Sequence, residues 1–336
     1  MSNKVIKNVG AGDTQSQPSD YRKLWTKPFI LAIVAVVILG VISMMTGVYD
    51  ILGQADGMSM FFITRVPRTV ALMLTGTAMS MAGLVMQLIT QNRLTEPSTT
   101  GTIEWGGLGL IFIYLFFPTP TLVLRMTGAI VFSFIGTMIF FLFLRQVKLR
   151  SSLIVPVVGM MLGAVVSAFS TFIGLTFQLT QNIENWFIGS FSAVQLGRYE
   201  YLWFVIIITI ITFVFADKLT LVGLGEDVAT NLGVKYNRIV ILGAVLISFS
   251  VGIVTAVIGN LPFLGLIVPN VVSMYRGDGL RENLPWVCVL GMGAIMICDI
   301  ISRTIIMPFE VPVSLILGTV GAVVFIITIL RKRRFT

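Results

Sequence analysis

The chain has 336 residues, of which 56% are hydrophobic and 11% are charged, with a net charge of +8. A soluble globular protein has about 25% charged residues, so this composition, with a mean hydropathy of +0.95, excludes an ordinary soluble enzyme and predicts a polytopic membrane protein. The chain has no histidine and two cysteines, which are the side chains that usually hold transition metals. We therefore expect no resident metal and no cofactor, and we expect no nucleic-acid partner.

The two ends of the chain are polar. Residues 1–28 contain no apolar core followed by a cleavage site of small residues, so they are predicted to be a cytoplasmic tail and not a signal peptide. Residues 331–336 are rich in Arg and Lys and are predicted to form a second, basic cytoplasmic tail. The region between them, 29–330, is predicted to be one transmembrane domain.

Ten apolar segments in this region are candidates to cross a hydrocarbon core of about 30 Å. They lie at residues 29–48, 67–90, 104–118, 122–144, 153–177, 200–216, 238–259, 262–275, 286–306 and 311–330. The segments 104–118 and 262–275 are short for a full span and contain or adjoin Gly and Pro, so they are candidates for broken or partly re-entrant helices covered by protein. The predicted fold class is an all-α integral membrane protein with about ten transmembrane helices.

The distribution of Lys and Arg predicts the orientation. With ten spans and a cytoplasmic N-terminus, all but five of the 23 basic residues fall on the cytoplasmic side, as the positive-inside rule requires. The exceptions are Arg65, Arg68, Arg125, Arg198 and Arg303. Both termini are therefore predicted to be cytoplasmic.

The stretch GLGEDVATNLGV (223–234) is a polar interruption between two apolar spans on the cytoplasmic side. Glu226 and Asp227 suit the first turn of a short helix, and Gly233 suits its C-terminus. Apolar residues recur at every fourth position, at Leu224, Val228 and Leu232. A helix of about two turns is not stable alone in water, so this stripe must pack on something. It either folds back on the chain's own spans or docks on a cytoplasmic partner, and the pattern alone does not decide.

Several motifs in order resemble the FecCD family of ABC importer permeases, which carry iron siderophores, haem and vitamin B12. These are RVPRTVALMLTGTAMSMAGLVMQLITQNRLTEPSTTG (65–101), GEDVATNLGV followed by a span and GNLPFLGLIVPN, and CDIISRTIIMPFEVPVSLILGTVGA (298–322). The resemblance covers nearly everything after residue 28. Three positions depart from the family's pattern: Arg93 stands where Pro is usual, EWGG (104–107) replaces S-x-G-A, and Asn270 replaces a frequent His.

The resemblance implies a type II ABC importer permease: a homodimer or pseudo-dimer of ten-helix subunits around one pathway, in the bacterial cytoplasmic membrane. Two cytoplasmic ABC ATPases and an extracytoplasmic solute-binding protein, periplasmic or a lipoprotein, are the implied partners, together with the lipid bilayer. The chain contains no G-x-x-x-x-G-K-[ST] motif, so it is not expected to be an enzyme, and a partner hydrolyses ATP. The family's coupling element between the sixth and seventh spans corresponds here to Gly225, Glu226, Asp227, Ala229, Leu232 and Gly233. Within it, small Ala229 is expected where the partner approaches closely, and Leu232 is the expected apolar anchor.

Three of the outer arginines fall where the family presents basic residues to acidic side chains of the binding protein, namely Arg65, Arg68 and Arg303. The plain structural alternative is that Arg303 pairs with Asp299 four residues earlier, while the other two extend into lipid headgroups.

The fifth span, 153–177, has no Asp, Glu, Lys or Arg at its centre. Its Gly, Ala and Ser residues are compatible with close helix packing, which we favour, or with a smooth channel wall. Because the resemblance places this helix at the pathway, Met160, Met161, Phe169 and Phe172 are candidate pathway residues.

The resemblance favours a ferric siderophore, of the catecholate type, as the cargo, and haem and vitamin B12 are the alternatives within the family. An ion-coupled secondary transporter normally carries ionisable residues at mid-membrane, which these spans largely lack. An intramembrane protease is disfavoured because the sequence has no His and no suitably placed pair of Asp. A purely structural or signalling membrane protein is compatible with the composition.

Overall fold

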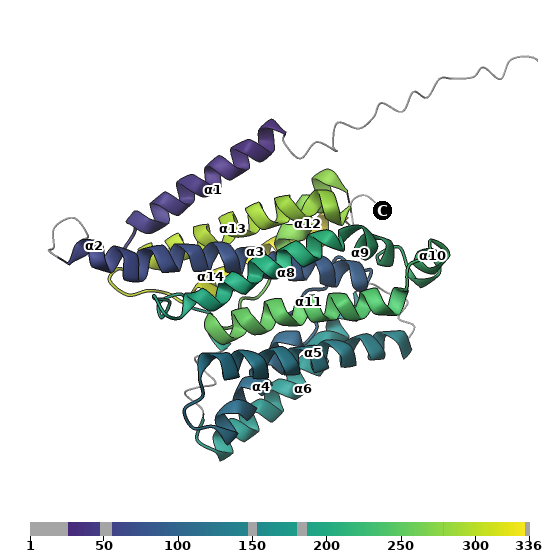
Figure 1. Cartoon of the computed structure of the whole chain (residues 1–336), viewed down its shortest axis with the longest axis horizontal. Coiled ribbons are helices and arrows are strands. Elements are labelled where there is room, and N and C mark those ends of the chain that lie inside the picture. The colour runs from purple at the N-terminus through teal and green to yellow at the C-terminus, as the bar shows by residue number, and fades with distance from the viewer. Residues whose placement is uncertain (1–25, 48–55, 147–152, 180–186, 278, 333–336) are drawn as a thin grey trace, which may run out of the picture.

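The structure is a computed structural model that describes residues 26–47, 56–146, 153–179, 187–277 and 279–332, with side chains as far as residue 326 in the last helix. Over these residues the regular structure is entirely helical (Figure 1). The longer helices are α1 (Lys27–Met45), α3 (Val66–Ile89), α4 (Thr102–Phe116), α5 (Leu122–Gln146), α6 (Ile154–Thr176), α8 (Phe204–Val214), α11 (Tyr236–Val257), α12 (Leu264–Arg276), α13 (Leu280–Thr304) and α14 (Val313–Lys332). The short elements are α2 (Gly57–Met60), the π-helix η2 (Phe61–Arg65), the 3-10 helix η3 (Tyr199–Trp203), α9 (Ala216–Val222) and α10 (Glu226–Asn231).

Each of the ten predicted apolar segments coincides with a helix, which confirms the all-α fold class. Six stretches of the described chain are long and apolar enough to cross a membrane, and a seventh qualifies if the bent pair Tyr199–Val214 and Ala216–Val222 is one span. The other helices among the ten are shorter over their described residues. The predicted tails, 1–28 and 331–336, lie almost entirely outside the described residues.

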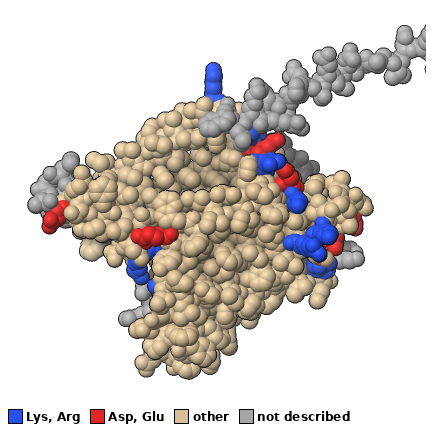
Figure 2. All heavy atoms as spheres, in the orientation of Figure 1, with Lys and Arg blue, Asp and Glu red and all other residues tan. Residues whose placement is uncertain are grey.

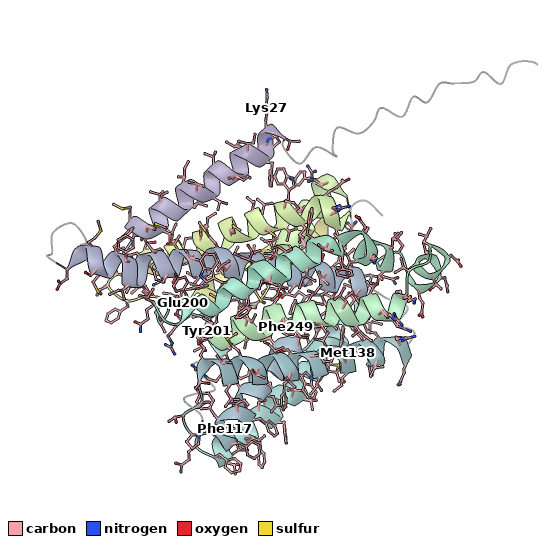
Figure 3. All side chains as sticks on the ribbon, in the orientation of Figure 1. Lys27, Phe117, Met138, Glu200, Tyr201 and Phe249 are labelled. Atoms are coloured by element: carbon pink, nitrogen blue, oxygen red, sulfur yellow. The ribbon has the colours of Figure 1, made fainter. Side chains whose placement is uncertain are left out.

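The helices run roughly side by side, so the bundle has two ends (Figure 1). The cytoplasmic end, in the predicted orientation, carries α9 and α10, and the outer end carries α2, η2 and the connection 305–312. In the view of Figure 2, most charged side chains lie toward these ends and most of the surface between them is uncharged. Figure 3 labels Met138 on α5 and Phe249 on α11, two helices that pack side by side along this surface. This distribution suits a bundle surrounded by lipid.

Helix α3 is the core of the bundle, because nearly all of its residues are buried. Its small residues let neighbouring backbones approach closely. A Cβ added to Gly76 would lie 2.5 Å from the carbonyl oxygen of Gly291 in α13, and one added to Gly83 would clash with the backbone of Gly265 in α12. Glycine is therefore required at both crossings.

Helix α12 covers only part of the membrane depth, as the sequence suggested for its segment. Its 13 residues span about 20 Å at 1.5 Å per residue, less than the hydrocarbon core. Its first turn packs on Gly83, inside α3, and its Asn270 amide donates to the backbone oxygen of Arg93, just beyond the end of α3. The N-terminus of α12 therefore lies inside the bundle.

A buried carboxylate accepts a hydrogen bond from the backbone at the internal start of α12. Glu96, in the connection between α3 and α4, is fully buried, and its Oε1 accepts a hydrogen bond of 2.8 Å from the backbone N–H of Phe263. A negative charge at a helix N-terminus is favourable because backbone N–H groups there lack partners within the helix. The connection that carries Glu96 thus enters the protein interior and positions α12.

Candidate functional sites at the two ends of the bundle

The predicted coupling segment forms a defined helix at the cytoplasmic end. The chain turns by 64° between α8 and α9, and Gly225, with φ of 106°, then starts α10. The helix ends as predicted at Gly233, whose φ of 80° is in the left-handed region. The N–H of Gly233 donates to the Thr230 oxygen and that of Val234 to the Ala229 oxygen, both at 2.9 Å. This is a Schellman motif, and glycine is the residue that it favours.

The two faces of α10 have different environments. Ala229 is fully buried against the chain itself, whereas Leu224, Val228 and Leu232 are exposed by 58%, 43% and 59%. Of these three, which we call the exposed stripe, only Val228 lies within α10, because Leu224 precedes Gly225 and Leu232 is the residue at which the helix ends. Ala229 is buried within the permease in this structure, so its expected contact with a partner stays a prediction that would require this face of α10 to open. The stripe is not folded back on the chain's own spans, so it is the surface available to a partner.

Of the two acidic residues in the first turn of α10, Glu226 forms a loose ion pair. Glu226 lies 3.6 Å from a guanidinium nitrogen of Arg145 at the end of α5, and both side chains are about half exposed. Arg145 also donates to the Asn237 side-chain oxygen at 3.0 Å. Asp227 is exposed. Exposed pairs of this kind contribute less than about 1 kcal/mol, so the charged groups add little to the position of α10.

Helix α9, which leads into α10, is fixed to the start of α13. The N–H of Leu280 donates to the Thr220 hydroxyl at 3.1 Å, and Arg281 forms an exposed ion pair of 2.7 Å with Asp217. Beside them, a pocket of about 380 Å³ opens between α9, the ends of α3 and α12, and the start of α13. The coupling segment is thus attached to the transmembrane helices through α9.

Two of the three outer arginines lie in a buried cluster of charges. The fully buried Asp299 carboxylate pairs with Arg68 at 2.7 Å and with Arg303 at 2.6 Å. Arg68 also lies 2.9 Å from Glu310 in the connection 305–312. Buried charges need such partners because an unpaired charge in the interior is costly. We call these four residues the outer charge cluster.

Arg303 also joins this cluster to the end of α1. It donates to the backbone oxygens of Ser43 and Thr46, at 3.1 and 2.8 Å, and to the Ser43 hydroxyl at 2.8 Å. Arg65, which is half-buried, donates to the same Thr46 oxygen. The pairing of Arg303 with Asp299, which the sequence offered as the structural alternative, is present.

The burial of Arg68 and Arg303 differs from the expectation of outward-facing guanidinium groups. Both side chains are directed to partners within the chain, and only a small part of each reaches the surface. A role for Arg65, Arg68 and Arg303 in receiving a binding protein stays a prediction, and any such contact must form at the rim of this cluster.

Helix α6 separates its small and large residues onto different faces. Gly159 and Gly163 are buried, and a Cβ on either would contact the backbone of residues 99–101. These glycines therefore serve close packing, as favoured from the sequence. The candidate pathway residues Met160, Met161, Phe169 and Phe172 all lie exposed, so they are available to lipid, to a second subunit or to a pathway.

Sequence reasoning missed two acidic residues. Glu96 looked like an ordinary loop residue, although its place between Thr and Pro in a chain with few acids was a signal. Glu310 was quoted within a motif but given no role.

Two departures from the family's pattern, Arg93 and Asn270, are in contact in the structure, because the Asn270 side chain donates to the Arg93 backbone oxygen.

The fold defines the class of protein to which the chain is similar. A solved structure described as an inward-facing conformation of a metal-chelate type ABC transporter aligns with a TM-score of 0.76 and 25% identity, over 90% of this chain and 99% of that chain. The sequence pattern of the FecCD transport family matches residues 28–331. The chain therefore belongs to the FecCD transport family, and it is a multi-pass membrane permease.

Two relatives cover most of the chain. The petrobactin import system permease protein FatD of Bacillus anthracis is 74% identical over 95% of this chain and 96% of its own length. The petrobactin import system permease protein YclN of Bacillus subtilis is 39% identical over 90% of this chain and 98% of its own length. These matches confirm the resemblance that the motifs indicated.

Proposed function

We propose that this chain is the membrane-spanning subunit of an ATP-driven importer for a ferric siderophore in the bacterial cytoplasmic membrane, with ferric petrobactin as the first candidate cargo. The observation that carries this proposal is the identity with FatD over nearly the whole chain. A chelate with catecholate-type groups is the finer proposal. Haem and vitamin B12 are the alternatives within the same family.

The partners follow from the proposed transport cycle. Two copies of the chain, or this chain and a paralogue, enclose the pathway, and residues 29–330 form the permease domain of each. A pair of cytoplasmic ABC ATPases binds the exposed stripe Leu224, Val228 and Leu232 in and beside each α10. This choice of surface is supported by its exposure, because large apolar side chains on a two-turn helix in water favour a partner.

The coupling residues have separate roles in this proposal. Leu232 anchors the ATPase, Glu226 stabilises the start of α10, and Gly225 and Gly233 set its ends. Ala229 packs α10 against the permease, and it would contact the ATPase only if this face of α10 opened. ATP-driven movement would then reach the transmembrane helices through α9, which is attached to α13 at Leu280 and Arg281.

The pathway is proposed to run along the exposed face of α6. Met160, Met161, Phe169 and Phe172 offer a large apolar surface without fixed charge, to which a bulky chelate would bind weakly. Weak binding favours passage because a tightly held cargo would be released slowly.

Uptake of radioactive iron supplied as ferric petrobactin tests the proposal. A strain lacking this permease and every other iron importer should lose uptake, and a plasmid copy of the chain should restore it. Loss of vitamin B12 or haem uptake with ferric petrobactin uptake unchanged would contradict the cargo and leave the family intact. Loss of uptake on ATP depletion, but not on collapse of the ion gradient, separates the importer from a secondary transporter.

A further inference from the structure

The two carboxylates of the outer charge cluster differ in their access to water. Asp299 is fully buried and lies between Arg68 and Arg303. Glu310 holds Arg68 from the outer side, with both carboxylate oxygens 2.9 Å from Nη1, and its side chain is 33% exposed. Arg68 therefore has an internal partner, Asp299, and an external partner, Glu310, that solvent can reach.

An outward-opening pocket adjoins the external partner. It has a volume of about 300 Å³, and Arg65, Arg68 and Glu310 lie on its wall, with Thr64, Ser192 and Gln195 among the remaining lining residues. An acidic side chain entering this pocket would approach two guanidinium groups. At Arg68, however, the incoming side chain would have to compete with Glu310, which is already bonded to Nη1.

The backbone around Glu310 does not have to move for its carboxylate to leave Arg68. The N–H of Val311 donates to the Ser302 oxygen at 3.1 Å, and the Ser302 hydroxyl donates back to the Val311 oxygen. These two bonds hold Val311, the residue after Glu310, against α13. A change of side-chain rotamer at Glu310 is therefore sufficient to free Nη1.

We propose that Glu310 is an exchangeable internal ligand of Arg68, which an acidic side chain of the extracytoplasmic binding protein displaces on docking. This inference rests on the proposed importer function. Asp299 stays paired with Arg68 throughout, and the incoming carboxylate takes the place of Glu310 at Nη1, so that the largely buried guanidinium keeps both of its ionic contacts in the docked state. Glu310 thereby lowers the affinity for the binding protein and favours its release after delivery.

The affinity of the binding protein for a Glu310→Gln transporter tests this inference. The complete transporter, with its ATPase, is reconstituted in lipid nanodiscs and titrated with the ferric-petrobactin-loaded binding protein of the same cell. Removing the competing charge should tighten Kd about three- to tenfold, since rim charge pairs have modest strength. Glu310→Asp keeps the charge and should change Kd less.

A matched control removes an outer charge that does not contact Arg68. Asp56 is exposed and makes no side-chain bond to the start of α2, so Asp56→Asn should leave Kd within about twofold of wild type. An equal tightening in Asp56→Asn would mean that net charge acts, and would overturn the inference.

Further outcomes separate the inference from the function on which it rests. If Arg65→Glu weakens binding while Glu310→Gln, assembled normally, leaves Kd unchanged or weaker, the exchange is wrong and the docking surface stands. If Arg65→Glu and Arg68→Gln both leave Kd unchanged, the binding protein does not dock on this surface. The proposed displacement of Glu310 is then wrong as well.

Discussion

The coupling segment at the cytoplasmic end exposes apolar side chains, whereas the outer charge cluster buries charged ones. In the coupling segment the exposed stripe is apolar, the small Ala229 is buried against the permease, and a local backbone motif ends α10. At the outer end, charged residues are drawn into the interior, where Asp299 joins three helices through Arg68 and Arg303. A change on α10 should therefore affect binding with little effect on the fold, whereas a change in the outer charge cluster should affect both.

The largest expected effect comes from Asp299→Ala. It leaves Arg68 and Arg303 buried side by side with only Glu310 to balance them, and removing one partner of a buried pair costs about 3–5 kcal/mol of unfolding free energy. Chemical unfolding of the purified transporter in detergent measures this. The control is Asp217→Ala, whose pair with Arg281 is exposed and should cost less than about 1 kcal/mol. Similar small losses in both variants would show that the outer charge cluster is not structural.

Leu232→Asp should have the next largest effect and should sharpen the contrast between the ends. Burial of one Leu contributes about 1.5–3 kcal/mol, so the amount of ATPase that copurifies with the permease should fall at least about tenfold. The free energy of unfolding of the permease should not change. Asn231→Asp places the same charge on the same helix beside the stripe. A similar loss of ATPase in that control would mean that charge, and not the stripe, decides assembly.

Gly233→Ala tests the backbone motif that ends α10. A residue with a Cβ in the left-handed region costs about 1–2 kcal/mol, so α10 should open more often and backbone hydrogen exchange there should accelerate. Gly279→Ala is the matched control, because Gly279 has φ of −69° and open space around its Cβ position. Equal exchange rates for α10 in both variants would argue against the motif.

Glu226→Gln should have the smallest effect. An exposed acid in the first turn of a helix contributes about 0.3–1 kcal/mol, and its pair with Arg145 adds little in salt. Transport per ATP hydrolysed should therefore fall by less than about fivefold, and the difference from wild type should shrink at high salt. A complete loss of transport, unaffected by salt, would instead indicate a direct and buried contact of Glu226 with the ATPase.

The helix α10 was predictable from sequence because its signals are local. Glu226 at its start, Gly233 at its end and an apolar spacing of four residues define it without reference to any other segment. Its orientation was not predictable. Ala229 and Leu232 are both compatible with an interface, and only the packing of neighbouring helices shows that Ala229 is the one that faces the permease.

The outer charge cluster shows the same division between local and distant contacts. The pairing of Asp299 with Arg303 follows from a spacing of four residues on one helix. The pairing of Asp299 with Arg68 joins residues 231 positions apart and depends on the close crossing of α3 and α13 at Gly76 and Gly291. No periodicity in a single sequence reports such a crossing.

The internal start of α12 has a consequence for how the protein responds to its lipids. Transmembrane helices usually match the thickness of the bilayer and tilt when it changes. Helix α12 is instead held at two points by a single connection, through Glu96 at Phe263 and through the Arg93 oxygen at Asn270. Its length and height are therefore set by protein contacts, and it should keep its depth in thin and thick membranes while the lipid-facing helix α1 tilts to follow them.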